Sequence, residues 1–212
     1  MRLLIALAAL AGLTQVPLGP VLLKPEFSLA RGMADWEPQG NGQWVMRDGF
    51  LRLDQAGVPG GPIRMPAGLA ILKSAPVNAF VLQVDLRSDA PVDLLVRDVD
   101  VVFGYQSPTQ FYYVHLAAKT DAVHTGIFVV NNADRTRLDD GKATSRLMDQ
   151  QWHRVRVERD TMSGAIRVFF DADVAPMLSA VDRTFTSGRV GVGSFDETGE
   201  FRNLEVRGSA SN

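Results

Sequence analysis

Alternating apolar and polar residues dominate the chain after residue 23. In residues 80–88 one face carries Phe80, Leu82, Val84 and Leu86, and the other carries Gln83, Asp85 and Arg87. This period of two is typical of a β-strand with one buried face. The same pattern predicts further strands at residues 44–46, 50–54, 70–74, 99–105, 112–118, 126–131, 152–160, 165–172, 189–194 and 201–207.

Short strands separated by turn residues indicate an all-β domain. Residues 152–160 and 165–172 are joined by a turn that contains Ser163 and Gly164, which predicts a hairpin. Each apolar strand face must be buried against a second sheet. The length of the chain favours a two-sheet antiparallel jelly-roll sandwich over the smaller immunoglobulin sandwich. The Gly- and Pro-rich residues 55–68 are predicted to form a long loop within this domain.

The predicted core follows from the strand periodicity. Ten apolar residues on the inward faces are expected to be buried between the two sheets: Phe80, Leu82, Val84, Val155, Val157, Ile166, Val168, Phe170, Val190 and Val192.

The N-terminus is typical of an export signal. Arg2 precedes an apolar run over residues 3–13, and no charged residue follows until Lys24. Residues 1–23 are therefore predicted to be a signal peptide or N-terminal anchor, and residues 24–212 a single domain in the periplasm or outside the cell. Pro17 and Pro20 disfavour a membrane-spanning helix, so membrane contact is expected only through this leader, if it is uncleaved.

Composition excludes several functional classes. The chain of 212 residues has 22 basic and 24 acidic residues and a formal net charge of −2, which leaves no basic footprint for nucleic acid. It contains no cysteine, so disulfides, thiolate metal sites and a cysteine nucleophile are excluded.

Candidate chemistry concentrates in residues 104–132. In the strand predicted at residues 112–118, Tyr112, Val114 and Leu116 form the more apolar face, which leaves Tyr113 and His115 facing outward. Aromatic rings stack on sugars, and amide, acidic and basic groups bond sugar hydroxyls. The expected substrate-binding residues around this face are Arg97, Asp98, Tyr105, Gln106, Tyr113, Lys119, Asn131, Asn132 and Arg135.

Six segments carry a resemblance to a known family. They are "ADWEPQGNGQWVMRDGFLRLD", "FVLQVDLRS", "DVDVVFGYQSPTQFYYVHLA", "GIFVVNNADR", "QWHRVRVERDTMSGAIRVFFD" and "GRVGVGSFDETGEFRNLEVRG". In this order they resemble the concanavalin A-like lectin/glucanase (laminin G-like) jelly rolls, and among these the branch related to the 3-keto-disaccharide hydrolase domains. The resemblance spans residues 35–208 and implies an exported protein with a carbohydrate ligand. This architecture occurs in carbohydrate-binding proteins, glycosidases, lyases and structural modules. The resemblance is therefore specific for the fold and much less specific for the activity.

Two histidines are the candidates for catalysis. His115 and His124 lie nine residues apart with Asp121 between them, and across a strand–loop–strand hairpin they could approach each other. This spacing matches no established metal motif, so acid/base chemistry, a metal cluster and a plain polar surface all stay open, and no metal ligand or cofactor is assigned. A structural calcium of the kind that many related jelly rolls hold is doubtful, because Arg202 stands where they often have Asp. Asp196 and Glu197 remain conceivable oxygen ligands.

Two hypotheses of function follow. Asp98 and Asp100 share a strand face, but the third acid of the Glu-x-Asp-x-Glu spacing of jelly-roll glucanases is absent, which disfavours an ordinary retaining glucanase. A hydrolase or lyase of the 3-keto type needs no carboxylate pair: a histidine removes the proton beside the keto group, and Tyr113 or Arg135 stabilises the enolate. The alternative is a non-catalytic, lectin-like module that uses the same residues, with Tyr113 as a stacking platform.

Overall fold

The computed structural model describes residues 19–210, and this part of the chain consists of strands and loops. No helix within it is long and apolar enough to span a membrane. Most of the predicted leader (residues 1–18) lies outside the described residues. Val21–Leu23, at its end, form strand β1, which pairs with β15.

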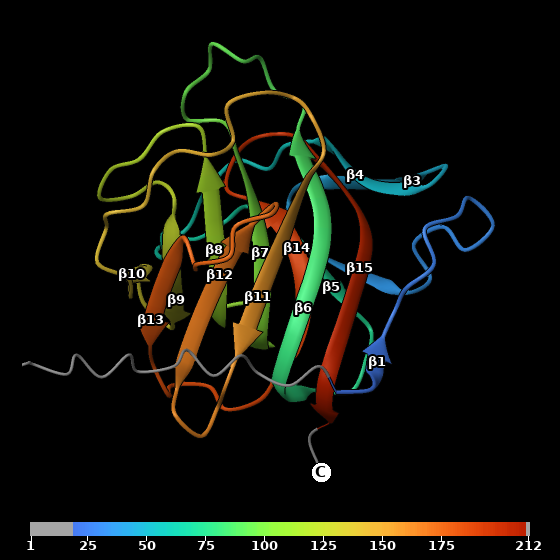
Figure 1. Ribbon diagram of the computed structural model, residues 1–212. Helices are drawn as coiled ribbons and strands as arrows, with labels where there is room; N and C mark the ends of the chain where they lie inside the picture. Colours follow the sequence, from blue (N-terminus) through green and yellow to red (C-terminus); the bar gives the residue numbers. More distant parts are fainter. Residues whose placement is uncertain (1–18, 211–212) are drawn as a thin grey trace, which may run out of the picture.

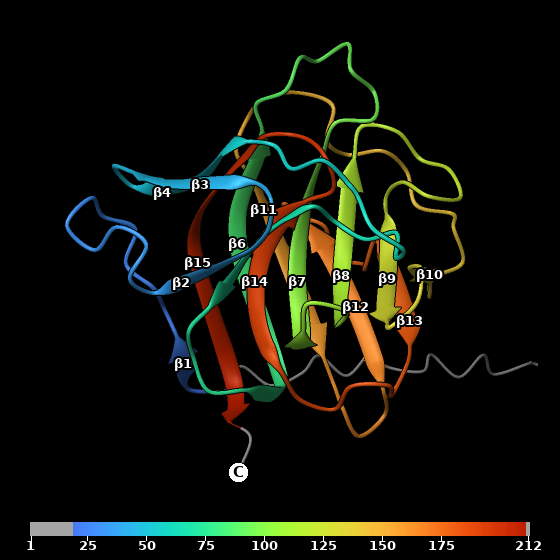
Figure 2. The same ribbon diagram turned by 180° about the vertical axis from the view of Figure 1, so that it is seen from behind.

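The strands form two antiparallel sheets that face each other, and the two views show them as two layers (Figures 1 and 2). The eight-stranded sheet runs in the order β13 (Leu178–Val181), β12 (Ala165–Phe170), β11 (His153–Arg159), β6 (Val77–Ser88), β15 (Gly199–Ala210), β4 (Phe50–Gln55) and β3 (Gln43–Arg47), with β1 also on β15. The seven-stranded sheet runs in the order β10 (Thr136–Arg137), β9 (Gly126–Asn131), β8 (Gln110–Ala117), β7 (Asp98–Ser107), β14 (Arg189–Ser194), β5 (Gly68–Leu72) and β2 (Trp36–Gly40). The predicted all-β, two-sheet antiparallel sandwich is confirmed.

The core lies between the two sheets. All ten residues predicted to fill it are at most 3% exposed. The predicted hairpin is formed by β11 and β12, with Val157 opposite Val168, and on its other side β11 places Val157 opposite Leu82 of β6. These cross-strand contacts put branched apolar side chains side by side on the inner face, which stabilises the register.

A glycine in β7 changes which side of the sheet the strand exposes. Val101 and Phe103 face the inter-sheet core, and strict alternation would turn Tyr105 the same way. Gly104 has a positive φ of 59°, and the register of β7 against β8 is irregular at this point. The irregularity turns Tyr105 to the outer face of the sheet, where it packs in a second apolar cluster.

Four short strands were missed by the periodicity argument: β1, β2, β10 and β13. β10 has two residues, too few to show any period. β2 contains Pro38, which argues against a strand, and it is tolerated because β2 lies at the edge of its sheet.

Candidate functional site

The outer face of the seven-stranded sheet is the side away from the inter-sheet core. Tyr113 and His115 lie on this face, as their alternation with Tyr112 and Val114 predicts. The expectation that they face solvent is wrong, because both are at most 2% exposed. Alternation along a strand identifies the face but carries no information about what covers it.

The cover comes from the predicted loop between β4 and β5. Figure 2 shows this teal segment crossing in front of β7 and β8 toward β9. Ile63 and Met65 pack onto the apolar cluster of the face. Between them, the backbone nitrogen of Arg64 donates to Asp134 at 2.7 Å and its carbonyl accepts from the nitrogen of Arg135 at 3.1 Å. The loop between β4 and β5 is therefore joined over the sheet to the loop between β9 and β10, which contains Asp134 and Arg135.

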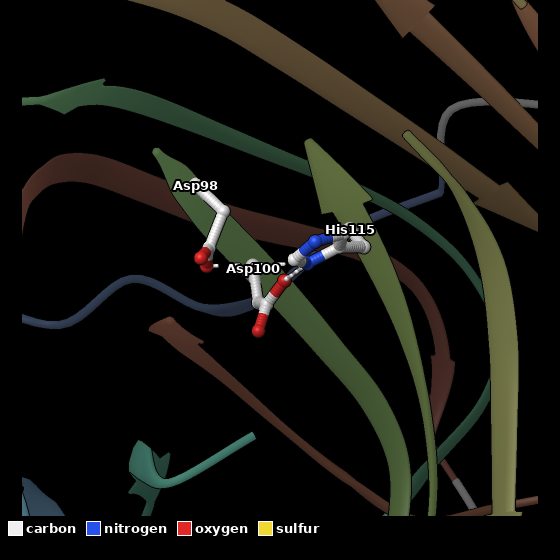
Figure 3. Close-up of side chains that lie close together, drawn as sticks. All are labelled: Asp98, Asp100 and His115. Carbon is white, nitrogen blue, oxygen red and sulfur yellow. Dashed lines mark hydrogen bonds and ion pairs between the residues drawn. The ribbon is translucent and has the colours of Figure 1, made fainter. Parts of the chain in front are cut away.

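Beneath this cover, two carboxyl groups and an imidazole meet. Asp98 and Asp100 come from β7 and His115 comes from the neighbouring strand β8, directly opposite Asp100 (Figure 3). Nδ1 of His115 lies 2.7 Å from Asp100 and 3.9 Å from Asp98. The described part of the chain buries all three almost completely.

Burial sets the protonation of this cluster. It raises the pKa of Asp98 to about 7, and the neighbouring carboxyl of Asp100 adds to the rise. Burial also raises the pKa of Asp100 well above its usual value, and it lowers the pKa of His115 to about 4. The cluster thus favours neutral forms of all three groups.

Hydrogen bonding treats the two carboxyl groups differently. Oδ1 of Asp98 accepts from the backbone nitrogen of Phe195 at 2.6 Å and from the hydroxyl of Ser194 at 2.8 Å. Oδ2 of Asp100 is buried and has no hydrogen-bond partner among the described residues. An unpaired buried carboxylate oxygen is unfavourable and suits a cation or a proton donor.

The cluster has the composition of a metal-ligand set. One ligand atom from each of Asp98, Asp100 and His115 lies within 4.8 Å of the others. Carboxylate oxygens and an imidazole nitrogen are ligands for divalent ions. Sequence reasoning placed Asp100 beside Asp98 on one face but did not include it among the site residues. The signal that would have added it was its position opposite His115 in a hairpin register.

A second chain of polar groups lies beside the cluster, in the loop between β8 and β9. Oδ1 of Asp121 is 2.8 Å from Nδ1 of His124, and Lys119 is 3.1 Å from the other carboxylate oxygen. Burial acts to raise the pKa of Asp121, but hydrogen bonds from the nitrogen of Val123, from Lys119 and from His124 hold it well below its usual value. The rings of His115 and His124 are 5.9 Å apart, so the two histidines do approach each other across the hairpin.

Tyr113 and Arg135 form a pair that closes one side of the cluster. Nη1 of Arg135 donates to the Tyr113 hydroxyl at 2.9 Å. The guanidinium also lies 4.3 Å from the ring centre of Phe195 and 4.8 Å from that of Phe128. Tyr113 has no ring face free for stacking on a sugar, which corrects its predicted role as a platform.

Four predicted binding residues lie elsewhere. Gln106, Asn131 and Asn132 stand at the opposite ends of β7 and β9 from the cluster, about 20 Å along the strands. The side chain of Gln106 donates to the carbonyl of Ser187. Arg97 is buried and donates to the carbonyl of Leu147 at 2.8 Å.

Tyr105 also lies away from the cluster, on the same outer face. It stacks with Phe111 at 6.0 Å and packs beneath the guanidinium of Arg189 at 5.1 Å. The structure therefore unites His115, Asp98, His124, Asp121, Lys119, Tyr113 and Arg135, and it separates the other five predicted residues from them.

The conceivable calcium ligands do not join the buried set. Asp196 is exposed and Glu197 is half-buried, and the one group of potential metal ligands found among residues 19–210 includes neither. Arg202 lies instead on the outer face of the eight-stranded sheet, against Trp152.

Comparison with known proteins finds similar structures but no similar sequences. The sequence matches no family model and no curated protein. Solved structures do match. Carbohydrate-binding module CBM66 from Bacillus subtilis superimposes with a TM-score of 0.59 at 15% identity, over 82% of this chain and 96% of that one. The winged bean acidic lectin in complex with methyl-α-D-galactose gives 0.57 at 13% identity, over 84% and 94%.

The chain has the concanavalin A-like jelly-roll fold. The exoplasmic/lumenal domain of VIP36, in its Ca²⁺/Man3GlcNAc-bound form, also shares the fold, with a TM-score of 0.55 at 12% identity over 88% of this chain and 89% of that one. At these low sequence identities, the similarity to concanavalin A-like proteins extends to the fold alone. The relation to 3-keto-disaccharide hydrolase domains stays a prediction.

Proposed function

We propose that the protein binds carbohydrate at the end of the seven-stranded sheet where His124 and Asp121 stand beside the buried cluster. The observation that carries the proposal is the convergence of Asp98, Asp100 and His115 with this second pair. Burying such groups together is unfavourable for folding, and strongly perturbed clusters of this kind concentrate at functional sites.

The ligand class is supported by the fold and by the groups at the surface of the site. The similar structures include a carbohydrate-binding module, a lectin complexed with methyl-α-D-galactose and a domain bound to Man3GlcNAc. Here Lys119 is exposed and His124 and Asp121 are half-buried. A cation, a carboxylate and an imidazole offer both donors and acceptors to sugar hydroxyls.

Substitutions in this group should weaken binding of a glycan. His124→Gln and Asp121→Asn are each expected to raise the Kd about tenfold, because each removes one partner from a hydrogen bond that involves a charged group. The measurement is isothermal titration with glycans first selected by array screening of the wild-type protein.

The matched control is Asp160→Asn. Asp160 lies in the turn between β11 and β12 and bonds Ser163 and the nitrogen of Met162, away from this site, so its replacement should leave this affinity unchanged. If all three variants lose affinity equally, or if His124→Gln and Asp121→Asn both keep the wild-type affinity, the glycan binds elsewhere.

The Asp121–His124 pair favours a second candidate function, elimination from a 3-keto sugar. Asp121 bonds Nδ1 of His124, which leaves Nε2 as the atom that takes a proton. Nε2 would remove the C2 proton of the sugar. The electron pair then forms the C1–C2 double bond as the C1–O bond breaks, and the departing oxygen takes a proton from solvent. His115, with Nδ1 bonded to Asp100 under the cover, is the less accessible base.

The two candidate functions differ in what His124→Gln removes. In an enzyme the substitution should lower kcat by about 10²–10⁴, while the KM for a 3-keto disaccharide changes only a few-fold. Product release from 3-keto disaccharides is followed by chromatography for the wild-type and variant proteins. A wild-type protein that binds the sugar without turnover is a binding module.

A further inference from the structure

The outer face of the eight-stranded sheet, at the front in Figure 1, contains two adjoining hollows over β11, β6 and β15. They measure about 320 and 330 Å³, which is within the range of small-molecule sites. Both hollows are lined by Arg154, Asp171 and Ala172, so they form one continuous groove. Asp85, Trp152, His153 and Arg202 line one end, and Gln83, Arg156, Asp173 and Val174 line the other.

The charged groups at the centre of the groove are held in fixed positions. Nε of Arg154 lies 2.8 Å from Oδ1 of Asp85, and the side-chain nitrogen of Asn203 donates to Oδ2 at 2.7 Å. Burial acts to raise the pKa of Asp85, but the bonds from Arg154 and Asn203 lower it overall, so Asp85 is ionised. Arg154 is thus anchored through one edge of its guanidinium, while more than half of its side chain stays exposed.

Asp171 is anchored in the same way on the opposite wall. Its backbone adopts a positive φ of 51°, a conformation that Asp tolerates better than most residues. One carboxylate oxygen accepts from the backbone nitrogen of Arg154 at 2.9 Å, and the other lies 2.9 Å from Nδ1 of His153. The groove therefore presents a donor and an acceptor in one lining, each held by hydrogen bonds to neighbouring groups.

Trp152 forms the end wall. The guanidinium of Arg202 lies 4.1 Å from the ring centre of Trp152, and that of Arg87 lies 4.9 Å away. These cation–π contacts hold the indole in place across the sheet.

The charge balance of the lining selects the class of ligand. The groove is lined by three arginines and three aspartates (Arg154, Arg156, Arg202, Asp85, Asp171 and Asp173), with His153 beside Asp171. An anionic ligand would meet Asp171 and Asp173, and a cationic one would meet the arginines. Fixed donors and acceptors beside an aromatic wall, without net charge, suit a neutral ligand with neighbouring hydroxyl groups.

We propose that this groove is a second carbohydrate site, which takes a neutral sugar unit between Arg154 and Asp171 with Trp152 as its end wall. The groove lies on the opposite sheet from His124 and shares no residue with the site proposed above. A test of this groove is therefore independent of a test of the site at His124 and Asp121.

Tryptophan fluorescence reports on this groove selectively. The chain has three tryptophans, and Trp36 and Trp44 are only 1% and 8% exposed, within the core. Titration of the protein with neutral oligosaccharides of glucose, xylose, mannose, galactose and fructose should give a saturable change in emission for at least one sugar series. Trp152→Phe should remove that change.

Affinity variants complete the test. Arg154→Gln and Asp171→Asn should each raise the Kd from this titration about tenfold, whereas His124→Gln, on the other sheet, should leave it unchanged. Thermal unfolding of each variant checks that it is folded. The proposal is overturned if no neutral series changes the emission, if Arg154→Gln has no effect on the Kd, or if polygalacturonate binds the groove more tightly than neutral sugars do.

Discussion

Replacing Phe170 with Ala should lower the free energy of unfolding by about 3–5 kcal/mol. Phe170 lies in β12, is 3% exposed and packs its ring 4.7 Å from that of His153. The substitution removes apolar contacts and leaves a cavity that the two rigid sheets cannot collapse around. Urea denaturation followed by circular dichroism gives the change in midpoint and slope.

The control for this prediction is Val181→Ala in the neighbouring strand β13. Val181 is 73% exposed, so its loss should change stability by no more than about 0.5 kcal/mol. A cost below about 1 kcal/mol for Phe170→Ala would contradict the packing of the two sheets described here.

At pH 8 the Asp98→Asn variant should be more stable than the wild type measured at the same pH. At pH 4 this gain in stability should be much smaller. Burial raises the pKa of Asp98 from 3.8 to about 7 in the folded state. The folded state therefore binds the proton more tightly than the unfolded state. The stability that this proton contributes is complete below pH 3.8 and is lost as the pH rises to about 7.

The asparagine side chain cannot ionise, so the variant escapes this loss. The difference between 3.8 and about 7 corresponds to on the order of 4 kcal/mol. Asn keeps an oxygen that can accept from Ser194 and Phe195, so the exchange preserves those bonds. His115 titrates in the opposite sense, because its lowered pKa makes its contribution fall as the pH drops from 6.5 through about 4. Comparison at equal pH largely cancels this term, since both proteins contain His115.

Thermal unfolding at pH 4 and pH 8, with EDTA present to remove divalent ions, measures the effect. Asp48→Asn is the control, because that carboxylate is exposed in the turn between β3 and β4. A variant that is less stable than the wild type at pH 8 would show that Asp98 is ionised and favourably paired in the folded protein.

The sequence predicted the two sheets well because each of the long strands turns one apolar face toward the core between the sheets. Residues such as Leu82 and Val157 repeat with a period of two over enough positions to define the inner face. The short strands β10 and β13 lack that length, and their pairing depends on β9 and β12, which are already in place.

The candidate site was predicted only in part, for a physical reason. Strand periodicity places Tyr113 and His115 on one face, but the loop that buries them is contributed by residues about 50 positions earlier. Likewise, the contact of Asp100 with His115 depends on the register of β7 against β8, which the turn geometry sets. Long-range cover and exact register are properties of the whole fold and are not encoded in any single segment.

The position of β15 has a consequence for how the chain acquires its structure during synthesis. β15 is the latest of the described strands to leave the ribosome, yet it lies inside its sheet, between β6 and the pair β4 and β1. Until it is available, β6 and β4 present open edges that can pair with other chains. The sandwich therefore completes only after this strand has been translated, through contacts distant in sequence, and such contacts favour slow folding.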